Sequence, residues 1–265
     1  MRQKLFQEKS SEKYALLEGR ESGPDEAHPY QQKMLGCPCP AISAMINHSY
    51  LKVEDSKQQI PIHKLMVALV ECYNLSWTFA IIFAIVGTLR LGKIFGFSIQ
   101  ELGVHGKIEH DASMTRFDAD KGNALDPSSK LIDQLFVSLG SETDPKNKAA
   151  KSVTLEDFAK RKLHLESQII KYDAQSKTEV NFLGRGEVSL ALQAHRIGDS
   201  GSTPPQANVQ ITANADWLRT WLSEERLPVE LGWRKPALKI TLLGTLGLMM
   251  RIKAIQDRLL QKTGL

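Results

Sequence analysis

The chain has 265 residues and a mass of 29.6 kDa, with 42% hydrophobic and 24% charged residues. This composition is typical of a globular protein with a substantial core, and it excludes a wholly disordered chain, a collagen-like repeat and a coiled coil. A net charge of +4 is too small to indicate nucleic-acid binding, and three cysteines are too few for a disulfide-rich secreted scaffold.

Three parts of the chain differ in composition. Residues 1–27 are polar and weakly periodic, which predicts a mobile arm, and no apolar stretch of a secretory signal peptide follows the first basic residues. We therefore expect an intracellular rather than a secreted protein. Residues 28–236 are expected to form one domain, and residues 237–265 a C-terminal helix that packs on the domain or on a membrane surface.

The predicted elements are mainly helices. Pro40 is well placed to open a helix over 41–47, and residues 63–86, apolar nearly all round, predict one long helix or two. The apolar run 77–89 is too short to span a bilayer and is interpreted as a buried core helix. Further helices are predicted over 131–139, from Thr154 towards Ile170, over 181–195 and over 216–225. Loops are predicted at 118–129 and 197–206. Strand patterns are scarce, so we predict a mainly α, single helical domain.

The first informative motif is Cys37-Pro38-Cys39-Pro40. A cysteine just before a helix meets unpaired backbone N–H groups, which favour a thiolate that can bind a metal or act as a nucleophile. A structural zinc site is disfavoured because Cys72 is the one further cysteine. A purely structural cysteine is the alternative.

Residues 38–48, PCPAISAMINH, resemble the proximal motif of the fungal heme-thiolate peroxidases, the chloroperoxidase and unspecific peroxygenase family. The departures are Ser43 where the family has Asn, Ile46 where it has Ala, and Ser49 where Gly is usual. The resemblance implies that Cys39 is the axial ligand of heme b iron and that Cys37 is not a ligand.

The second motif is Glu109-His110-Asp111-Ala112-Ser113. Its carboxylates and hydroxyl are oxygen ligands of the kind that hard divalent cations bind, with a solvated charged turn as the alternative. The motif resembles the second signature of the same family. That resemblance implies a Mg²⁺ or Mn²⁺ ion at a heme propionate, bound by the side chains of Glu109 and Ser113 and by the backbone carbonyl of His110.

The resemblance also implies a distal acid that the imidazole of His110 orients. Glu187, between Gly186 and Val188, is the predicted residue, and Glu179 is the alternative. A third stretch, Glu225-Arg226-Leu227-Pro228 followed by Leu231-Gly232-Trp233, resembles the C-terminal signature of the family and is expected to be structural. The resemblance spans about Tyr30 to Pro236.

The family implies a chloroperoxidase-type fold that encloses heme, and an enzyme that uses hydrogen peroxide to insert oxygen into small hydrophobic organic substrates, with one-electron peroxidase side activity. No nicotinamide or flavin motif indicates a reductase partner. The alternatives are a halogenating peroxidase, a non-catalytic heme-binding sensor or carrier, and a helical membrane-associated protein whose motifs are coincidental. Peripheral membrane contact and a homodimer are further expectations.

Overall fold

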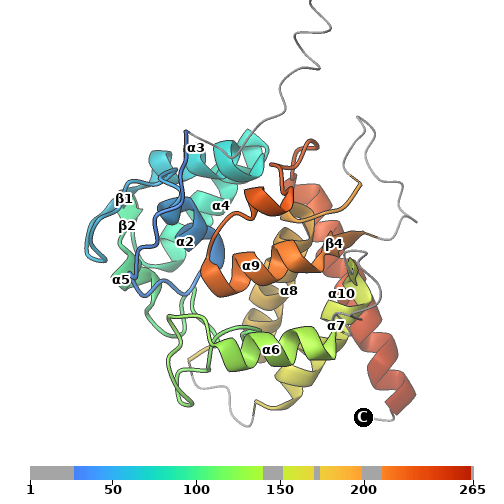
Figure 1. Cartoon of the computed structure of the whole chain (residues 1–265). Coiled ribbons are helices and arrows are strands. Elements are labelled where there is room, and N and C mark those ends of the chain that lie inside the picture. The colour runs from blue at the N-terminus through green and yellow to red at the C-terminus, as the bar shows by residue number, and fades with distance from the viewer. Residues whose placement is uncertain (1–26, 140–151, 170–173, 199–210, 264–265) are drawn as a thin grey trace, which may run out of the picture.

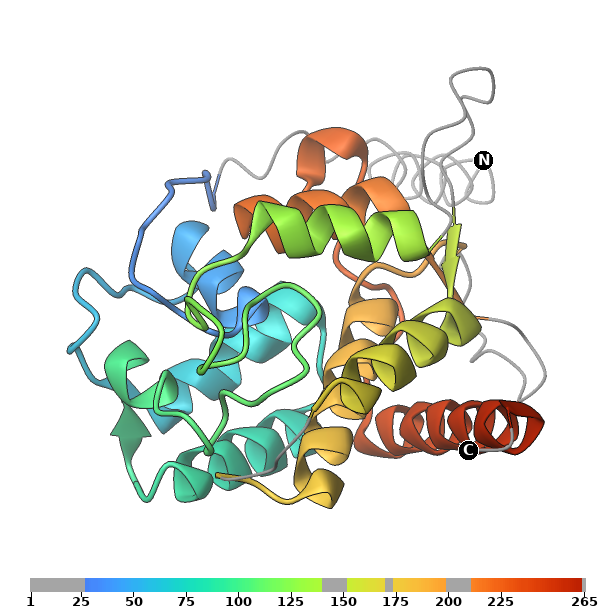
Figure 2. The ribbon, with the colours of Figure 1, turned by 90° about the horizontal axis from the view of Figure 1, so that it is seen from below.

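The computed structural model describes residues 27–139, 152–169, 174–198 and 211–263. The predicted mobile arm lies almost wholly outside these residues, as do most of the loop expected at 197–206 and the end of the helix expected at Ile170. Residues 40–102 lie on one side of the molecule and the helices over 155–167, 177–194 and 242–263 on the other, and the loop 103–128 runs between them (Figures 1 and 2). This loop carries the Glu-His-Asp motif, so the fold places that motif at the centre.

The first side of the fold consists of four helices and one antiparallel pair of short strands. Its elements are α2 (Pro40–Asn47), β1 (Ile60–Pro61), α3 (Ile62–Tyr73), α4 (Trp77–Arg90), β2 (Gly96–Phe97) and α5 (Ile99–Leu102). The apolar segment 63–86 forms two helices. Asn74, in the left-handed conformation with φ of 56°, ends α3, and the Ser76 side chain caps α4 by accepting a hydrogen bond from the Phe79 N–H.

The second side holds the longer helices. Its elements are α6 (Ser129–Ser138), β3 (Ser152–Thr154), α7 (Leu155–Ser167), α8 (Lys177–Ala194), β4 (Thr212–Asn214), α9 (Ala215–Glu224), the 3-10 helix η1 (Val229–Leu231) and α10 (Leu242–Thr263). Thr154 is the N-cap of α7, at the predicted start of this helix, and it forms a capping box with Asp157. A second capping box of Ser176 and Glu179 starts α8 four residues before the predicted position.

In the described residues, sheet structure is limited to two antiparallel pairs, β1 with β2 and β3 with β4. The scarcity of strand patterns in the sequence agrees with this. The fold is a mainly helical single domain, as predicted.

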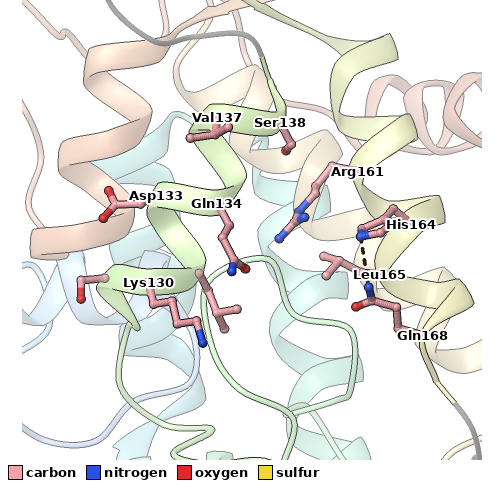
Figure 3. A pocket seen from close by; sticks show the side chains of 11 residues that line it. Lys130, Asp133, Gln134, Val137, Ser138, Arg161, His164, Leu165 and Gln168 are labelled. Carbon is pink, nitrogen blue, oxygen red and sulfur yellow. Dashed lines mark hydrogen bonds between the residues drawn. The ribbon is translucent and has the colours of Figure 1, made fainter.

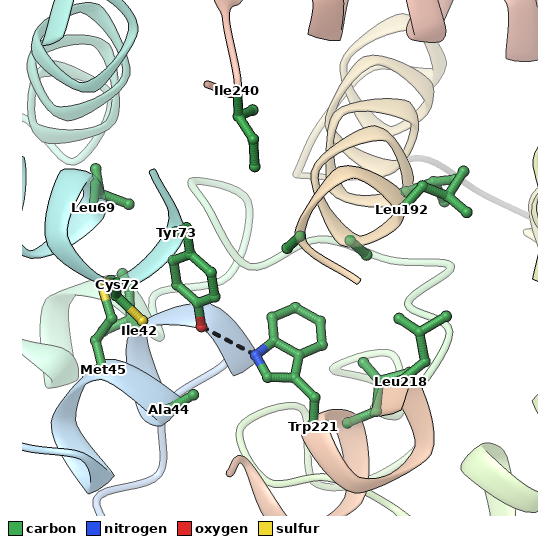
Figure 4. Close-up of a cluster of buried hydrophobic side chains, with 14 of the residues drawn as sticks. Ile42, Ala44, Met45, Leu69, Cys72, Tyr73, Leu192, Leu218, Trp221 and Ile240 are labelled. Carbon is green, nitrogen blue, oxygen red and sulfur yellow. Dashed lines mark hydrogen bonds between the residues drawn. The ribbon is translucent and has the colours of Figure 1, made fainter. Parts of the chain in front are cut away.

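One hydrophobic core joins the two sides. Figure 4 shows Tyr73 at the end of α3 meeting Trp221 of α9, whose indole N–H donates to the Tyr73 hydroxyl over 3.0 Å. Met45 of α2 and Leu192 of α8 are buried in the same core. Trp233 of the C-terminal signature is also buried, and it donates to the Ala194 carbonyl at the end of α8. The signature is therefore structural in this fold.

The interpretation of residues 77–89 as a buried core helix is wrong for one face of α4, along its whole length. Small residues, Ala80, Ala84 and Thr88, face the fold and are fully buried, and α4 packs on α3. The opposite face holds exposed large apolar side chains, with Val86 58% and Leu89 57% exposed. Contact between small residues buries one narrow face, so the bulky residues on the other face stay accessible. Among the described residues, no helix is long and apolar enough to span a bilayer.

The C-terminal helix α10 packs against α7 and α8. Leu248, Met249 and Ile252 are buried in this contact, whereas Leu243 and Met250 are exposed.

Candidate functional site

Cys39 stands immediately before α2, as its N-cap residue. Pro40 occupies the first helical turn, where its missing N–H leaves no donor unsatisfied. Burial raises the pKa of the Cys39 thiol, and the nearby backbone N–H groups of Ile42 and Ala41 act in the opposite direction without forming a side-chain cap. The helix N-terminus therefore favours a thiolate as predicted, but in the protein alone burial outweighs it. A positive charge bound to the sulfur, such as a metal ion, would reverse the balance.

The two other cysteines lie in different surroundings. Cys37 is buried, its thiol donates to the Cys39 carbonyl over 3.5 Å, and burial raises its pKa to about 12. Cys72 is buried in α3 within the hydrophobic core. Cys39 is partly accessible and has backbone N–H groups directed at its sulfur, so it is the cysteine best placed to bind a metal from outside the chain.

The Glu-His-Asp loop is held at several points. The Glu109 carboxylate lies 2.5 Å from the His105 imidazole, and burial raises the pKa of Glu109 more than this contact lowers it. The Ser113 hydroxyl accepts hydrogen bonds from the backbone N–H groups of Thr115 and Arg116. The Asp118 carboxylate accepts from the Ala112 N–H over 2.7 Å. These bonds fix the loop backbone around His110.

His110 and Glu187 come together from distant parts of the chain. His110 Nδ1 donates to the Asp111 carbonyl over 2.7 Å, which leaves Nε2 facing the Glu187 carboxylate at 3.2 Å. This pair is held by charge, because the buried Nε2 has no aligned hydrogen-bond partner. Burial opposes charge on both groups, but their attraction dominates, so the pKa of His110 is raised and that of Glu187 is lowered.

Glu187 is accessible although it pairs with His110. Because 48% of its side-chain surface is exposed, a molecule from outside the chain can reach its carboxylate. The charge of Glu187 also acts on the Cys39 sulfur, so the two groups lie within electrostatic reach of one another.

The alternative acid, Glu179, has a different role in the structure. Its carboxylate caps the start of α8 at Ser176, and it pairs with Arg90 of α4 at 3.3 Å. Glu187, two turns further along the same helix, is the carboxylate that meets His110.

Two cations that the sequence did not single out connect these parts. Lys162 of α7 is fully buried, and its ammonium donates to the Ala112 carbonyl over 2.8 Å, one residue before Ser113. Arg116 donates to the Cys37 carbonyl over 3.1 Å and pairs with Glu225 after α9. Arg116 thereby ties the Glu-His-Asp loop to the cysteine segment. The signal for Lys162 was weak, since its helix looked amphipathic and lysines are rarely buried.

These residues fit a heme bound through sulfur. A partly accessible Cys39 and an accessible Glu187 supply a ligand and an acid–base group. A divalent cation has two candidate donor sets in the loop. One is Glu109, the His110 carbonyl and Ser113, and the other is Asp111, Asp118 and Asp120, whose carboxylate oxygens lie within 4.8 Å of one another. Asp118 also pairs with Lys121 at 2.6 Å.

Residues 28–238 match the family model described as "Peroxidase, family 2". This is more than half of the chain, and it coincides with the range of about 30–236 over which the motifs resemble that family. No curated protein matches the chain.

Proposed function

Because the chain belongs to peroxidase family 2, the heme-thiolate chloroperoxidase family, and is an oxidoreductase that acts with hydrogen peroxide, we propose that it inserts oxygen into small hydrophobic organic substrates. Hydroxylation and epoxidation are the proposed reactions, with one-electron peroxidase side activity. The observation that supports the assignment best is the contact of His110 Nε2 with the Glu187 carboxylate at 3.2 Å, in which 48% of the Glu187 side chain stays accessible.

Cys39 is the proposed axial ligand of the heme iron. Heme bound there would supply the oxidising chemistry, with thiolate donation favouring cleavage of the O–O bond. The backbone N–H groups at the start of α2 would stabilise the ligating thiolate. Cys37, buried with a strongly raised pKa, would remain a thiol.

Glu187 is the proposed acid–base group. Its carboxylate accepts the proton from one oxygen of hydrogen peroxide and delivers it to the other oxygen, which leaves as water. His110 holds this carboxylate in position and keeps its pKa low, so that Glu187 is able to accept a proton at neutral pH. The Asp111 carbonyl fixes the imidazole by accepting the Nδ1–H.

A divalent cation is proposed at the Glu-His-Asp loop, with Glu109, Ser113 and the His110 carbonyl as ligands. In this structure the Glu109 carboxylate contacts His105, so binding of the ion would require Glu109 to exchange that contact for the metal. Mg²⁺ and Mn²⁺ both suit oxygen ligands.

The substrate preference is proposed from the apolar residues of α4. Phe79 is buried, Phe83 lies at its edge with the two rings 6.0 Å apart, and we propose that both line the substrate channel. Apolar walls favour hydrophobic substrates over ionic ones.

We propose peripheral membrane contact at the outer face of α4, in an intracellular protein. Ile85, Val86 and Leu89 are exposed on this face.

The carbon monoxide spectrum of the reduced heme protein tests the proposal. We expect a strongly red-shifted Soret band, which reports thiolate opposite the bound gas. Cys39→Ala should abolish this band, and Cys37→Ala, the matched control two residues away, should retain it. Loss of the band in Cys37→Ala alone would show that the wrong sulfur is assigned.

Peroxide assays with and without bromide separate oxygen insertion from halogenation. Bound heme without turnover would indicate a sensor or carrier.

A further inference from the structure

A groove separate from the heme site lies between α6 and α7. Its volume is about 860 Å³, within the usual range for small-molecule sites. Leu131 and Val137 of α6 and Leu165 of α7 supply apolar lining, and Gln134 and Gln168 supply polar groups (Figure 3).

Arg161 of α7 points into this groove (Figure 3). The residue is only 9% exposed, and its Nε is buried with no hydrogen-bond partner. In the described part of the chain, no carboxylate or carbonyl accepts from its guanidinium. Burial lowers the pKa of Arg161, and no acidic group opposes this effect.

The neighbouring charged side chains do not neutralise Arg161. Asp133, the one acidic residue of the lining, pairs with Arg219 of α9 at 2.8 Å. His164 contacts Gln168, and Lys130 adds a second basic side chain at the groove. The groove is therefore positively charged, with an unpartnered cation inside it.

An unpartnered buried guanidinium destabilises a fold, because a buried charge normally requires a partner. A planar anionic group would provide that partner, since guanidinium binds carboxylate or phosphate through two parallel hydrogen bonds. We propose that the groove between α6 and α7 binds an amphipathic organic anion, whose carboxylate or phosphate pairs with Arg161 and whose apolar part lies against Leu131, Val137 and Leu165.

This site is distinct from the one that carries out peroxide chemistry. Lys162, the next residue of α7, lies about 100° further round the helix. Its ammonium binds the Ala112 carbonyl in the loop that carries His110. The two functions would therefore share α7 but use different faces of it.

Calorimetric titration of the heme-loaded protein tests the proposal, with octanoate, octyl phosphate and neutral octan-1-ol as probes. We expect one or both anions to bind and octan-1-ol to bind at least about tenfold more weakly. Arg161→Met should weaken anion binding by a similar factor. Lys160→Met, the matched control, removes a neighbouring exposed charge that pairs with Glu156 at 3.0 Å outside the groove, and it should bind as the wild type does.

Thermal unfolding supplies a second measurement. Because Arg161 has no partner, Arg161→Met should raise the melting temperature of the ligand-free protein, and octanoate should stabilise the wild type but not this variant. Equal binding of octanoate to wild type and Arg161→Met, or equal binding of octan-1-ol and octanoate, would overturn the proposal. A lowered melting temperature together with unchanged anion binding would assign Arg161 a structural role and overturn it too.

Discussion

Lys162 and Gly184 occupy complementary positions where α7 meets α8. A Cβ atom added at Gly184 would lie 2.2 Å from the Lys162 Nζ and 2.4 Å from its Cε, both far below contact distance. The absence of a side chain at 184 thus gives the lysine its path across α8 to the Ala112 carbonyl, 2.8 Å away. Through this path α7 holds the loop that carries His110 next to the helix that carries Glu187.

Gly184→Ala should therefore destabilise the protein although alanine is the better helix former. We expect a loss of about 1–3 kcal/mol in the free energy of unfolding, because the lysine must move. In a Lys162→Ala background the collision is removed, and Gly184→Ala should stabilise by about 0.5–1 kcal/mol. Chemical denaturation of the four proteins measures this reversal of sign. Gly186→Ala is the control, since its Cβ would meet only Met249 Cε at 3.9 Å and should stabilise in both backgrounds.

The acid–base assignment predicts a selective kinetic defect in Glu187→Gln. The amide cannot accept a proton, so heme binding should persist while cleavage of hydrogen peroxide slows by about 10²–10⁴-fold. Stopped-flow absorbance of the heme-loaded variant measures this rate. Glu179→Gln, on the same helix, should cleave peroxide at the wild-type rate, because Glu179 pairs with Arg90 instead. A fast Glu187→Gln together with a slow Glu179→Gln would exchange the two roles.

His195 predicts a pH dependence of stability that is independent of the heme site. The imidazole is fully buried at the end of α8, with its ring 4.8 Å from that of Trp221, and burial lowers its pKa from 6.5 to about 4. The unfolded chain therefore binds a proton that the folded chain excludes between these two pH values. Stability from this group is present above pH 6.5 and is lost as the pH falls towards 4, by about 3 kcal/mol in total.

Denaturant titrations of wild type and His195→Phe between pH 4 and 7 check this prediction. The phenylalanine keeps an aromatic ring against Trp221, so the variant should lose less stability than the wild type as the pH falls. His63→Phe, at an exposed position of α3, should follow the wild-type curve. If wild type and His195→Phe respond to pH in parallel, the buried imidazole does not titrate as stated.

The sequence allowed a local prediction wherever neighbouring residues decide the structure. Pro40 at the start of α2 and Thr154 as the N-cap of α7 are short-range features, and both were found where expected. The order and spacing of the motifs indicated the family, which the match over residues 28–238 confirms. The boundaries of α8 were less well predicted, because the Ser176–Glu179 capping box lies in a polar stretch with little apolar periodicity.

Distances between segments could be decided only by the tertiary structure. The sequence favoured Glu187 over Glu179, but only the packing of α8 shows that Glu179 pairs with Arg90 and Glu187 with His110. The exposed face of α4 was mispredicted because an apolar run indicates only that burial is favourable, not that a partner is present to cover it. Likewise, the partner of a buried cation depends on which atoms surround it. Lys162 reaches a carbonyl, whereas the Nε of Arg161, one residue earlier, has no hydrogen-bond partner among the described residues.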